Sequence, residues 1–492
     1  MQTTVRIEPN GSVSAVTVDA RVLATIQDAR PAVFWLDRPD APTPELPEGP
    51  LDTQADLVVV GAGYSGLWAA LQAAEDDPDR RIVVIEADAV GSKASGRNGG
   101  FCSASITHGI ANGIERFPDE LDRLQQLGRE NLDGIEAAVA RYGIDCGFER
   151  TGAIEVATAP WQLDGLREAM DVEVAHGEDV VWLERDAVRA EVDSPTYHGG
   201  YWHRSGEAMV DPARLAWGLA DACRGHGVTI YERTALTGLE RSGAAVAVQT
   251  DRGTIRASAV VIATNAFPSP IRRIRRLIAP VYDHVLATEP LTEEQLDAIG
   301  WRNRQGISDA TNLFHYYRLT DDARATGGEG PRIVWGGYDA VYHFANRIDE
   351  SLEQRDATHH ILARHFLDTF PQLEGIRFTH RWGGVIDTCT RFAVSFGTHL
   401  DGRVAYAVGY TGLGVGATRF GARVCLDLLY NPDSPLLELD FVRRSPLPFP
   451  PEPLRWIGIS LTRKALERAD RNGGRRGLWL RTLDAVGLGF DS

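Results

Sequence analysis

The chain has 492 residues, of which 43% are hydrophobic and 24% charged, and its formal net charge is −17 at pH 7. This length is too great for one hydrophobic core, so two domains are expected. The composition is ordinary for a globular protein, and no apolar run is long enough to cross a membrane. The negative charge argues against nucleic acid and anionic membranes as partners.

Residues 1–53 predict an N-terminal arm and linker. Residues 1–9 lack the basic and apolar regions of a signal peptide, which favours a cytoplasmic protein. The aromatic stretch Pro31–Pro39 predicts a packed, extended arm, and four prolines within residues 40–50 predict a linker. The five cysteines share no metal-ligand spacing, which fits a reduced compartment and no metal site.

The next segment predicts a strand, a glycine turn, a helix and a second strand. Asp56–Val60 and Arg81–Glu86 are apolar and rich in β-branched residues, as buried parallel strands are. Between them, Gly61–Gly66 has the GxGxxG pattern and Leu67–Ala74 is helical. A membrane span over these residues is disfavoured by the glycines and by polar residues such as Gln72. The unit therefore predicts a nucleotide-binding domain.

The glycines, the helix start and Glu86 of this unit each have a chemical role. Gly61 permits the tight turn, Gly63 lets the backbone approach a pyrophosphate, and Gly66 lets the helix pack on the sheet. The helix N-terminus attracts the pyrophosphate through unpaired N–H groups. Glu86 can accept hydrogen bonds from both ribose hydroxyls, and its charge disfavours a 2′-phosphate.

A second glycine-rich loop, Gly91–Gly100, follows Glu86. The order of strand, glycine turn, helix, strand, acidic residue and second glycine loop predicts a flavin site. Such a loop suits a flat ring because glycine allows close backbone approach and exposes N–H donors.

The rest of the sequence predicts a mixture of helices and strands. Helices are predicted over Glu115–Tyr142, Leu163–His176, Ala213–His226 (with Asp211 and Pro212 as its start signal), Ser351–Phe370, and from the glycines after residue 409 to Leu429. Strands are predicted over Gly152–Thr158, Tyr201–Val210, Val228–Glu232, Thr234–Glu240, Ala244–Thr250, Gly253–Ala257, Ala259–Ala263, Val281–Ala287, Leu313–Leu319, Arg332–Gly336 and Gly402–Gly409. His359 and His360 are expected on the surface of their helix, without a metal. Residues 431–492 are a tail with no predicted chemistry.

The chain resembles the D-amino-acid-oxidase-like superfamily of FAD amine oxidoreductases. Three segments carry the resemblance in order: Val60–Gly66 with Glu86, Ala259–Asn265, and Gly409–Gly414. Ala94–Gly100 is similar to the γ-glutamylputrescine oxidase branch, as are Arg381–Gly384 and Tyr316–Thr320. The resemblance implies an α/β fold with an α+β second domain. Residues 54–110, 205–270 and 380–430 would form a glutathione-reductase-type FAD domain, and residues 111–204 and 271–379 an antiparallel-sheet substrate domain.

The resemblance also implies the site residues. FAD would be held noncovalently, because Trp382 stands where an attaching cysteine would fall. The implied cofactor-binding residues are Gly61, Gly63, Tyr64, Ser65, Gly66, Glu86, Ala87, Ser95, Gly96, Arg97, Asn98, Gly99, Gly100, Leu236, Ala263, Thr264, Trp382, Gly383, Gly412, Leu413, Gly414 and Val415. The substrate-side candidates are Lys93, Tyr317, Arg318 and Trp382, followed by Tyr338, Tyr410 and His108, of which Tyr338 is expected in the core and His108 as a helix cap.

The implied reaction is oxidation of an amine C–N bond, with hydride transfer to flavin N5 and hydrolysis of the resulting imine. Oxygen is the expected acceptor, although Lys93 is the lone lysine near the flavin loop and stands where an apolar residue is commoner. Two alternatives stay open. One is an FAD dehydrogenase of amino or hydroxy acids that uses another acceptor, and the other is a flavin-binding protein without turnover. The expected partners are a small-molecule amine and an electron acceptor, and the sequence does not set the oligomeric state.

Overall fold

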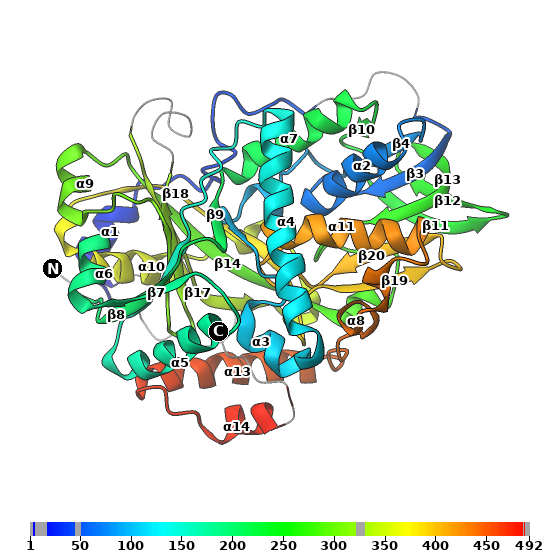
Figure 1. Ribbon diagram of the computed structural model, residues 1–492. Helices are drawn as coiled ribbons and strands as arrows, with labels where there is room; N and C mark the ends of the chain where they lie inside the picture. The colour runs from blue at the N-terminus through cyan, green and yellow to red at the C-terminus, as the bar shows by residue number, and fades with distance from the viewer. Residues whose placement is uncertain (1–2, 5–16, 45–50, 321–329, 486, 488–492) are drawn as a thin grey trace.

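The computed structural model describes residues 3–4, 17–44, 51–320, 330–485 and 487. Two large sheets organise these residues, one in each half of the elongated molecule in Figure 1. Part of the predicted linker, residues 45–50, lies outside the described residues. Within the described residues, none of the helices combines the length and apolar character that crossing a membrane requires.

The first sheet is mostly parallel. Its order from edge to edge is β10 (Thr229–Tyr231), β4 (Ile82–Ile85), β3 (Gln54–Val60), β13 (Gly253–Ile262), β12 (Ala245–Thr250) and β11 (Leu236–Ser242), with β20 (Val404–Val408) also beside β13 and β19 (Ser395–His399) beyond it. Strands β10, β4, β3, β13 and β20 run parallel, whereas β11 and β12 are antiparallel.

Both faces of this sheet are covered. On one face, Leu57 and Val59 of β3 pack in a core with four helices: α2 (Tyr64–Asp76), α4 (Leu121–Tyr142), α7 (Pro212–Gly225) and α11 (Gly414–Tyr430). On the other face, Val58 and Val60 pack in a core with β12 and the start of β14. The continuous apolar run of β3 is explained by this double burial, as is usual for parallel strands.

The second sheet is mainly antiparallel. Its order is β18 (Phe378–Cys389), β14 (Ile278–Thr288), β17 (Ile333–Tyr342), β16 (His315–Leu319), β15 (Gly306–Asp309), β6 (Ala153–Ala157), β8 (Gly199–His203) and β7 (Val180–Glu184). Helices α10 (Asp356–Thr369) and α1 (Ala20–Ile26) pack on one face, where they share a core with β16 and β17.

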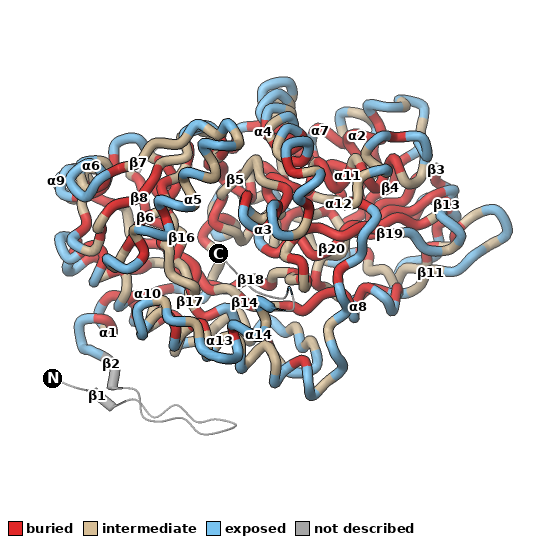
Figure 2. The backbone as a smooth tube through the Cα atoms, turned by 60° about the horizontal axis from the view of Figure 1, so that its bottom comes forward, coloured by how far each residue is buried: buried red, intermediate tan, exposed pale blue. Residues whose placement is uncertain are grey.

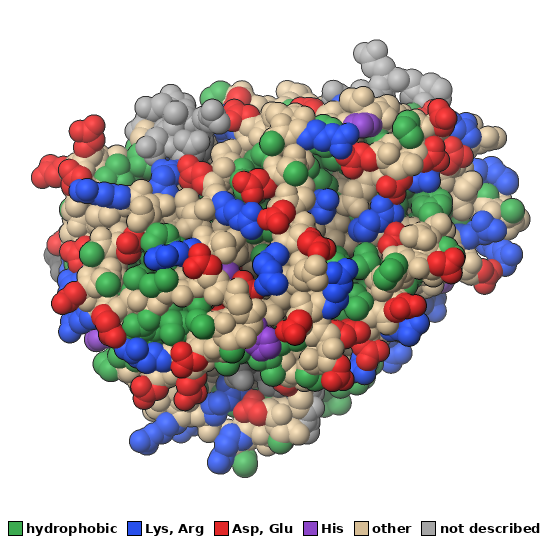
Figure 3. Space-filling view, viewed as in Figure 1, with side chains coloured by type: hydrophobic (Ala, Val, Ile, Leu, Met, Phe, Trp, Pro, Cys, Tyr) green, Lys and Arg blue, Asp and Glu red, His purple; other side chains and the backbone are tan. Residues whose placement is uncertain are grey.

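Shorter elements connect these layers. They are β1 (Thr3–Thr4), β2 (Thr17–Val18), β5 (Phe101–Ser103), β9 (Glu207–Met209), α3 (Gly109–Arg116), α5 (Leu163–Ala175), α6 (Arg185–Glu191), α8 (Ile274–Leu277), α9 (Glu293–Ile299), α12 (Asp440–Arg443), α13 (Leu454–Arg471) and α14 (Leu478–Ala485). Strands β5 and β9 pair with each other, so the chain leaving the second glycine loop is joined to the segment after β8. Figure 3 shows acidic and basic side chains interspersed over the face that carries α4.

Four elements differ from the sequence-based prediction. The predicted helix from residue 115 to 142 is two helices, because Pro118 begins a separate 3-10 turn between α3 and α4. The predicted strand over residues 201–210 is split into β8 and β9, which belong to different sheets. The two strands predicted between Gly253 and Ala263 are the single strand β13, whose first half pairs with β12 and whose second half pairs with β3 and β20.

Two other predictions change with the tertiary packing. The helix expected from residue 351 is a 3-10 turn, Glu350–Glu353, followed by α10. His359 is fully buried on α10 rather than exposed, and its Nε2 lies 3.2 Å from the carbonyl of Trp382. Residue 380, where a domain boundary is expected, lies within β18 of the second sheet.

Candidate active site

One cavity of about 1270 Å³ lies where the two sheets meet. The carboxyl ends of β3, β4 and β13 form one end of its lining, and residues of β14, β16, β17 and β18 form the other. Cavities that hold a single ligand are commonly about 300–1,000 Å³. This cavity is therefore large enough for a cofactor and a substrate side by side.

The first glycine turn forms the innermost wall. Gly61 has φ +107°, and a Cβ there would lie 2.6 Å from the carbonyl oxygen of Ala263. A Cβ on Gly66 would lie 1.8 Å from the carbonyl oxygen of Gly61. Helix α2 begins directly after Gly63, which has no side chain to cap it; Ser95 Oγ accepts the N–H of Tyr64, and the first turn lines the cavity at Tyr64 and Ser65. The turn fits a bound anion such as a pyrophosphate.

Glu86 lies at the end of β4 and lines the same part of the cavity. Its carboxylate accepts hydrogen bonds from the backbone N–H groups of Ala62, at 2.8 Å, and Asp88, at 2.9 Å. Burial raises the pKa of Glu86. A carboxylate has about four acceptor positions, so capacity remains for hydroxyl donors of a ligand.

Thr264 supplies a second polar group at this end. Its Oγ1 is buried and has no hydrogen-bond partner in the part of the chain that the structure describes. Thr264 lines the cavity together with Ala87, Leu236 and Ala263. Because buried hydroxyls normally have a partner, this one points to a bound ligand. With the glycine turn and Glu86, it fits the nucleotide portion of FAD.

The second glycine loop, Gly91–Gly100, is folded around the side chain of Asn98. The Asn98 amide donates to the carbonyls of Ala94 (3.0 Å) and Ser95 (2.9 Å), and its Oδ1 accepts from the backbone N–H of Gly100 at 2.9 Å. Ser95 Oγ also accepts from the backbone N–H of Tyr64 at 2.9 Å, which joins this loop to the first turn. The loop is therefore a preformed wall rather than an open turn.

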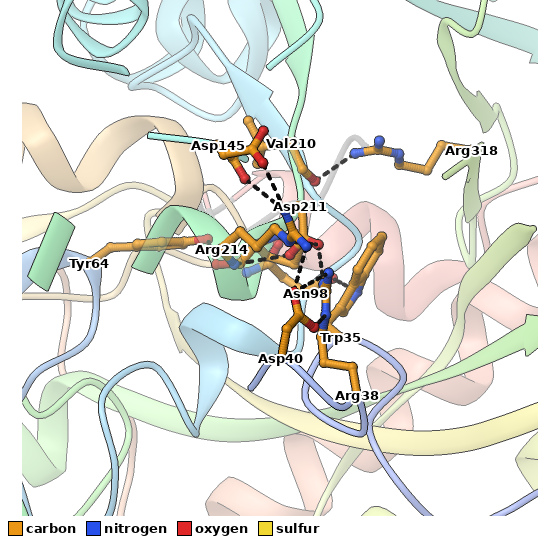
Figure 4. A network of polar contacts seen from close by, with 11 residues as sticks. Trp35, Arg38, Asp40, Tyr64, Asn98, Asp145, Val210, Asp211, Arg214 and Arg318 are labelled. Atoms are coloured by element: carbon orange, nitrogen blue, oxygen red, sulfur yellow. Dashed lines mark hydrogen bonds and ion pairs between the residues drawn. The ribbon is translucent and has the colours of Figure 1, made fainter. Parts of the chain in front are cut away.

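Three side chains hold this loop from behind. The indole N–H of Trp35 donates to the Asn98 carbonyl at 2.9 Å, and that of Trp382 donates to the Arg97 carbonyl at 2.8 Å. Arg318 donates to the carbonyls of Val210 (2.7 Å) and Gly100 (3.3 Å). Figure 4 shows Trp35 and Arg318 approaching this region from different segments, and an ion pair between Arg38 and Asp211 beside them.

The structure thereby corrects two substrate-side predictions. Arg318 and Trp382 are almost fully buried and do not line the cavity. Their donors are used by backbone carbonyls, so we assign both residues to positioning the loop. The N-terminal arm, through Trp35, belongs to the same support.

Tyr317 is also corrected. Its ring stacks on Trp335 at a centroid distance of 4.3 Å, and its hydroxyl lies 2.6 Å from that of Tyr197 in the core. The preceding residue, Tyr316, lines the cavity instead and donates to Asp283 Oδ2 at 2.5 Å. Successive strand residues face opposite sides, so the prediction chose the wrong face of β16. A Cβ on Gly99 would lie 2.5 Å from Tyr316, which places this ring directly beside the second glycine loop.

Asp283 was missed by the sequence analysis. It lies on β14 and lines the cavity beside Tyr316. Burial raises its pKa to about 6, although hydrogen bonds from Tyr316 and the backbone act in the opposite direction. No local sequence pattern marks it, because its neighbours on β14 are ordinary strand residues.

The last predicted glycine segment closes the cavity from the side of β20. Residues 412–415 line it, and α11 begins at Gly414 without a side-chain cap, as α2 does. The buried carboxylate of Asp387 accepts the backbone N–H of Gly409 at 2.5 Å and fixes this turn. Tyr410 lines the cavity and its hydroxyl accepts from Ser65 Oγ at 3.0 Å, which links the two helix starts.

Lys93 lines the cavity, but its ammonium is paired. Its Nζ lies 3.0 Å from Asp88 Oδ2 and 3.4 Å from Glu350 Oε1. Because Asp88 is two residues past Glu86, these contacts hold Lys93 toward the nucleotide end. Tyr338, expected in the core, lines the cavity, as does His108, whose Nε2 lies 3.1 Å from the Thr411 carbonyl.

The predicted residues thus fall into two groups. Those that line the cavity are Gly61, Gly63, Tyr64, Ser65, Glu86, Ala87, Lys93, Ser95, Arg97, Asn98, Gly99, Leu236, Ala263, Thr264, Gly412, Leu413, Gly414 and Val415. Those outside the lining are Gly66, Gly96, Gly100, Gly383, Tyr317, Arg318 and Trp382. The glycines of the second group permit close packing instead; for example, a Cβ on Gly96 would lie 2.3 Å from the Gly91 carbonyl oxygen.

The fold and the cavity define a dinucleotide-binding flavoprotein. The family model described as "FAD dependent oxidoreductase" (DAO) matches residues 56–428. The chain belongs to this family and is an FAD-dependent enzyme, which confirms the predicted family and cofactor.

Named relatives agree with this assignment. Gamma-glutamylputrescine oxidoreductase of Escherichia coli is 34% identical over 76% of this chain and 83% of its own length. Among solved structures, glycine oxidase from Geobacillus kaustophilus has a TM-score of 0.64 and 19% identity, over 80% of this chain and 99% of that one. L-proline dehydrogenase from P. horikoshii has a TM-score of 0.64 and 17% identity, over 80% and 98%. These likenesses confirm the predicted fold class.

The hydrogen bonds from Trp35 and Trp382 to the second glycine loop can be tested by substitution. We expect Trp35→Phe and Trp382→Phe each to weaken FAD binding about fivefold, because each removes one hydrogen bond worth about 1 kcal/mol to a loop carbonyl. Titration of the apoprotein with FAD, followed by fluorescence, measures the change. Trp161→Phe, at a half-exposed tryptophan outside the cavity lining, is the control. Unchanged affinity in both loop variants would contradict the assignment.

Proposed function

We propose that the enzyme oxidises the C–N bond of an amine or amino acid. The observation that carries this proposal is the charge of the cavity. Glu207, Asp283 and Asp387 line it without an ion-pair partner in the described part of the chain, whereas Arg97 is paired with Glu353 at 2.5 Å and Lys93 with two carboxylates. Arg455 also lines the cavity and has only neutral hydrogen-bond partners among the described residues. The three carboxyl groups outnumber it, and the excess of negative charge when they are ionised suits an ammonium group.

The relatives' names support the same substrate class. They include gamma-glutamylputrescine oxidoreductase, sarcosine oxidase subunit beta and glycine oxidase, all named for amines or amino acids. Tyr316 and Tyr410 add aromatic surface on which an ammonium can be held.

Bound FAD would supply the hydride acceptor for the carbon beside the amine nitrogen. The chain's own part is to prepare the amine. Asp283 accepts the proton of the incoming ammonium, so that the neutral amine is the reacting form. Tyr316 holds the Asp283 carboxylate in place through its 2.5 Å hydrogen bond. The imine that leaves is hydrolysed by water to a carbonyl compound and an amine or ammonia.

The experiment that tests the proposal compares amines with hydroxy acids. The FAD-loaded enzyme is mixed without oxygen with matched pairs that differ only in an amino or hydroxyl group. We expect the amines to bleach the flavin absorption and the hydroxy acids to leave it unchanged. Bleaching by the hydroxy acids alone would favour the dehydrogenase alternative, and no bleaching by either would favour a protein without turnover.

The electron acceptor is the second part of the proposal. Oxygen remains the acceptor expected from the resemblance, but the paired state of Lys93 argues that this lysine does not assist it. We expect Lys93→Met to change the rate of reoxidation by air less than about twofold. Stopped-flow mixing of the reduced enzyme with oxygen measures this rate, with Lys464→Met as the control at the chain's other lysine. A large loss confined to Lys93→Met would show that Lys93 serves the oxygen reaction.

We keep the cytoplasm as the proposed compartment. All five cysteines are buried and none is in a disulfide. Unpaired cysteines suit a reducing environment.

A further inference from the structure

The C-terminal segment, residues 446–485, forms the outer wall of the cavity. Helices α13 and α14 cross the bottom of the molecule in Figure 1, where α13 packs against β17 and α14 packs against α13. Figure 2 shows the same end of the molecule from below. This segment lies beyond residue 428, where the family match ends. The family match therefore does not describe this part of the cavity wall.

The segment is docked by specific contacts. Asp470 of α13 accepts the side-chain amide of Asn312 at 2.6 Å and its backbone N–H at 3.0 Å. The backbone N–H of Phe449 donates to the Arg276 carbonyl at 2.8 Å. Leu466 packs with Leu313 in a small core of its own. The wall is therefore part of the folded structure.

The surface that this wall turns to the cavity is apolar. Leu447, Phe449, Leu454, Ile459, Leu466 and Trp479 all line it. Leu313 and Phe314, from the segment before β16, line the cavity as well. This end of the site thus offers hydrophobic contact over a substantial area.

The charged groups of the wall are already engaged. Arg463 is paired with Asp339, which is also paired with Arg355. Arg455 is buried and donates to the side chain of Asn346 at 2.6 Å and to the Pro450 carbonyl at 3.2 Å. Both partners of Arg455 are neutral oxygens, so its positive charge is not balanced by a carboxylate within the described residues. A polar but uncharged end of a substrate would lose its water against the surrounding apolar side chains, which is costly.

We infer that the substrate is an amine with an extended apolar substituent. The inference rests on the proposed function, because it takes the ammonium to lie at the carboxylates beside Tyr316. The apolar substituent then extends from the second glycine loop along the C-terminal segment. An amine whose far end carries a hydroxyl group fits this apolar surface less well than an alkylamine of the same length.

The test uses the FAD-loaded enzyme and two series of probes. One is n-alkylamines from four to eight carbons, and the other is amino alcohols of the same lengths with a terminal hydroxyl group. Anaerobic flavin reduction gives the dissociation constant of each probe and the rate at saturation. We expect alkylamine binding to tighten by about fourfold per methylene. We expect the hydroxyl-ended probes to bind at least about tenfold more weakly at equal length, because the hydroxyl group loses its water against apolar side chains.

Matched variants locate the effect. Ile459→Glu puts a charge on the cavity side of α13, and Leu461→Glu puts one on its outer side, where Leu461 is 47% exposed and does not line the cavity. Leu454→Glu repeats the test at a residue that lines the cavity but is 60% exposed, so that a charge there does not disturb folding. We expect Ile459→Glu and Leu454→Glu to weaken octylamine binding at least about tenfold and butylamine binding much less, and Leu461→Glu to change neither.

The outcomes separate the two proposals. If amines bleach the flavin but chain length has no effect, or if the three variants behave alike, the inference about the C-terminal segment is overturned and the proposed function stands. If no amine of either series bleaches the flavin, the proposed function fails first.

Discussion

We expect replacement of Gly63 with valine to yield a folded protein that no longer retains FAD. Gly63 has φ −85° and ψ −176°, an extended conformation that valine adopts readily. A Cβ there would lie 2.8 Å from Ser95 Oγ, which accepts the N–H of Tyr64. The branched side chain would also fill the space in front of the uncapped start of α2. We expect FAD affinity to fall at least 100-fold, about 2.7 kcal/mol.

Visible absorption after dialysis, followed by FAD titration, measures this loss. Gly165→Val is the matched control, because Gly165 lies in α5 with no atom within 4 Å of the added Cβ. The control is expected to remain fully loaded with FAD. A Gly63→Val protein that stays yellow with unchanged affinity would contradict the position assigned to the pyrophosphate.

Asp283→Asn is expected to slow anaerobic flavin reduction by about 10²–10⁴-fold, the range typical of general acid–base groups. The wild-type rate should follow the ionisation of Asp283, whose pKa is raised to about 6 by burial. Below this pH the carboxyl group is protonated and cannot accept the proton of the ammonium. The rate at low substrate concentration should therefore rise with pH through about 6, and the variant should lack this limb.

Tyr316→Phe tests the role of Asp283 by removing the hydrogen bond that its carboxylate accepts from Tyr316. The hydrogen bond from Tyr316 lowers the pKa of Asp283, so its removal should move the acid limb to higher pH. Tyr317→Phe is the matched control, because the hydroxyl of Tyr317 contacts Tyr197 in the core. An acid limb that shifts equally in both variants, or in neither, would exclude Asp283 as the titrating group.

The nucleotide end of the site was predictable because its signals are local. Gly61, Gly63 and Glu86 belong to one strand–helix–strand unit, and each residue type follows from what the turn must do there. The structure places all three at the cavity as predicted. The second loop was also recognisable, although the sequence does not reveal that Asn98 folds it internally.

The substrate end could not be derived in the same way. Tyr316 and Tyr317 are adjacent and chemically alike, and only the packing of β16 decides which one faces the cavity. Arg318 is a plausible anion-binding residue until its carbonyl partners from distant segments are known. The contribution of residues 446–485 depends on contacts such as Asp470 with Asn312, which are remote in sequence.

The most direct measurement is anaerobic flavin reduction by one amine in two forms, unlabelled and deuterated at the carbon beside the nitrogen. The proposed function predicts that both forms bleach the flavin and that the deuterated amine does so more slowly, because this C–H bond is broken in the step observed. Absence of bleaching by any amine, or equal rates for the two forms, would contradict it.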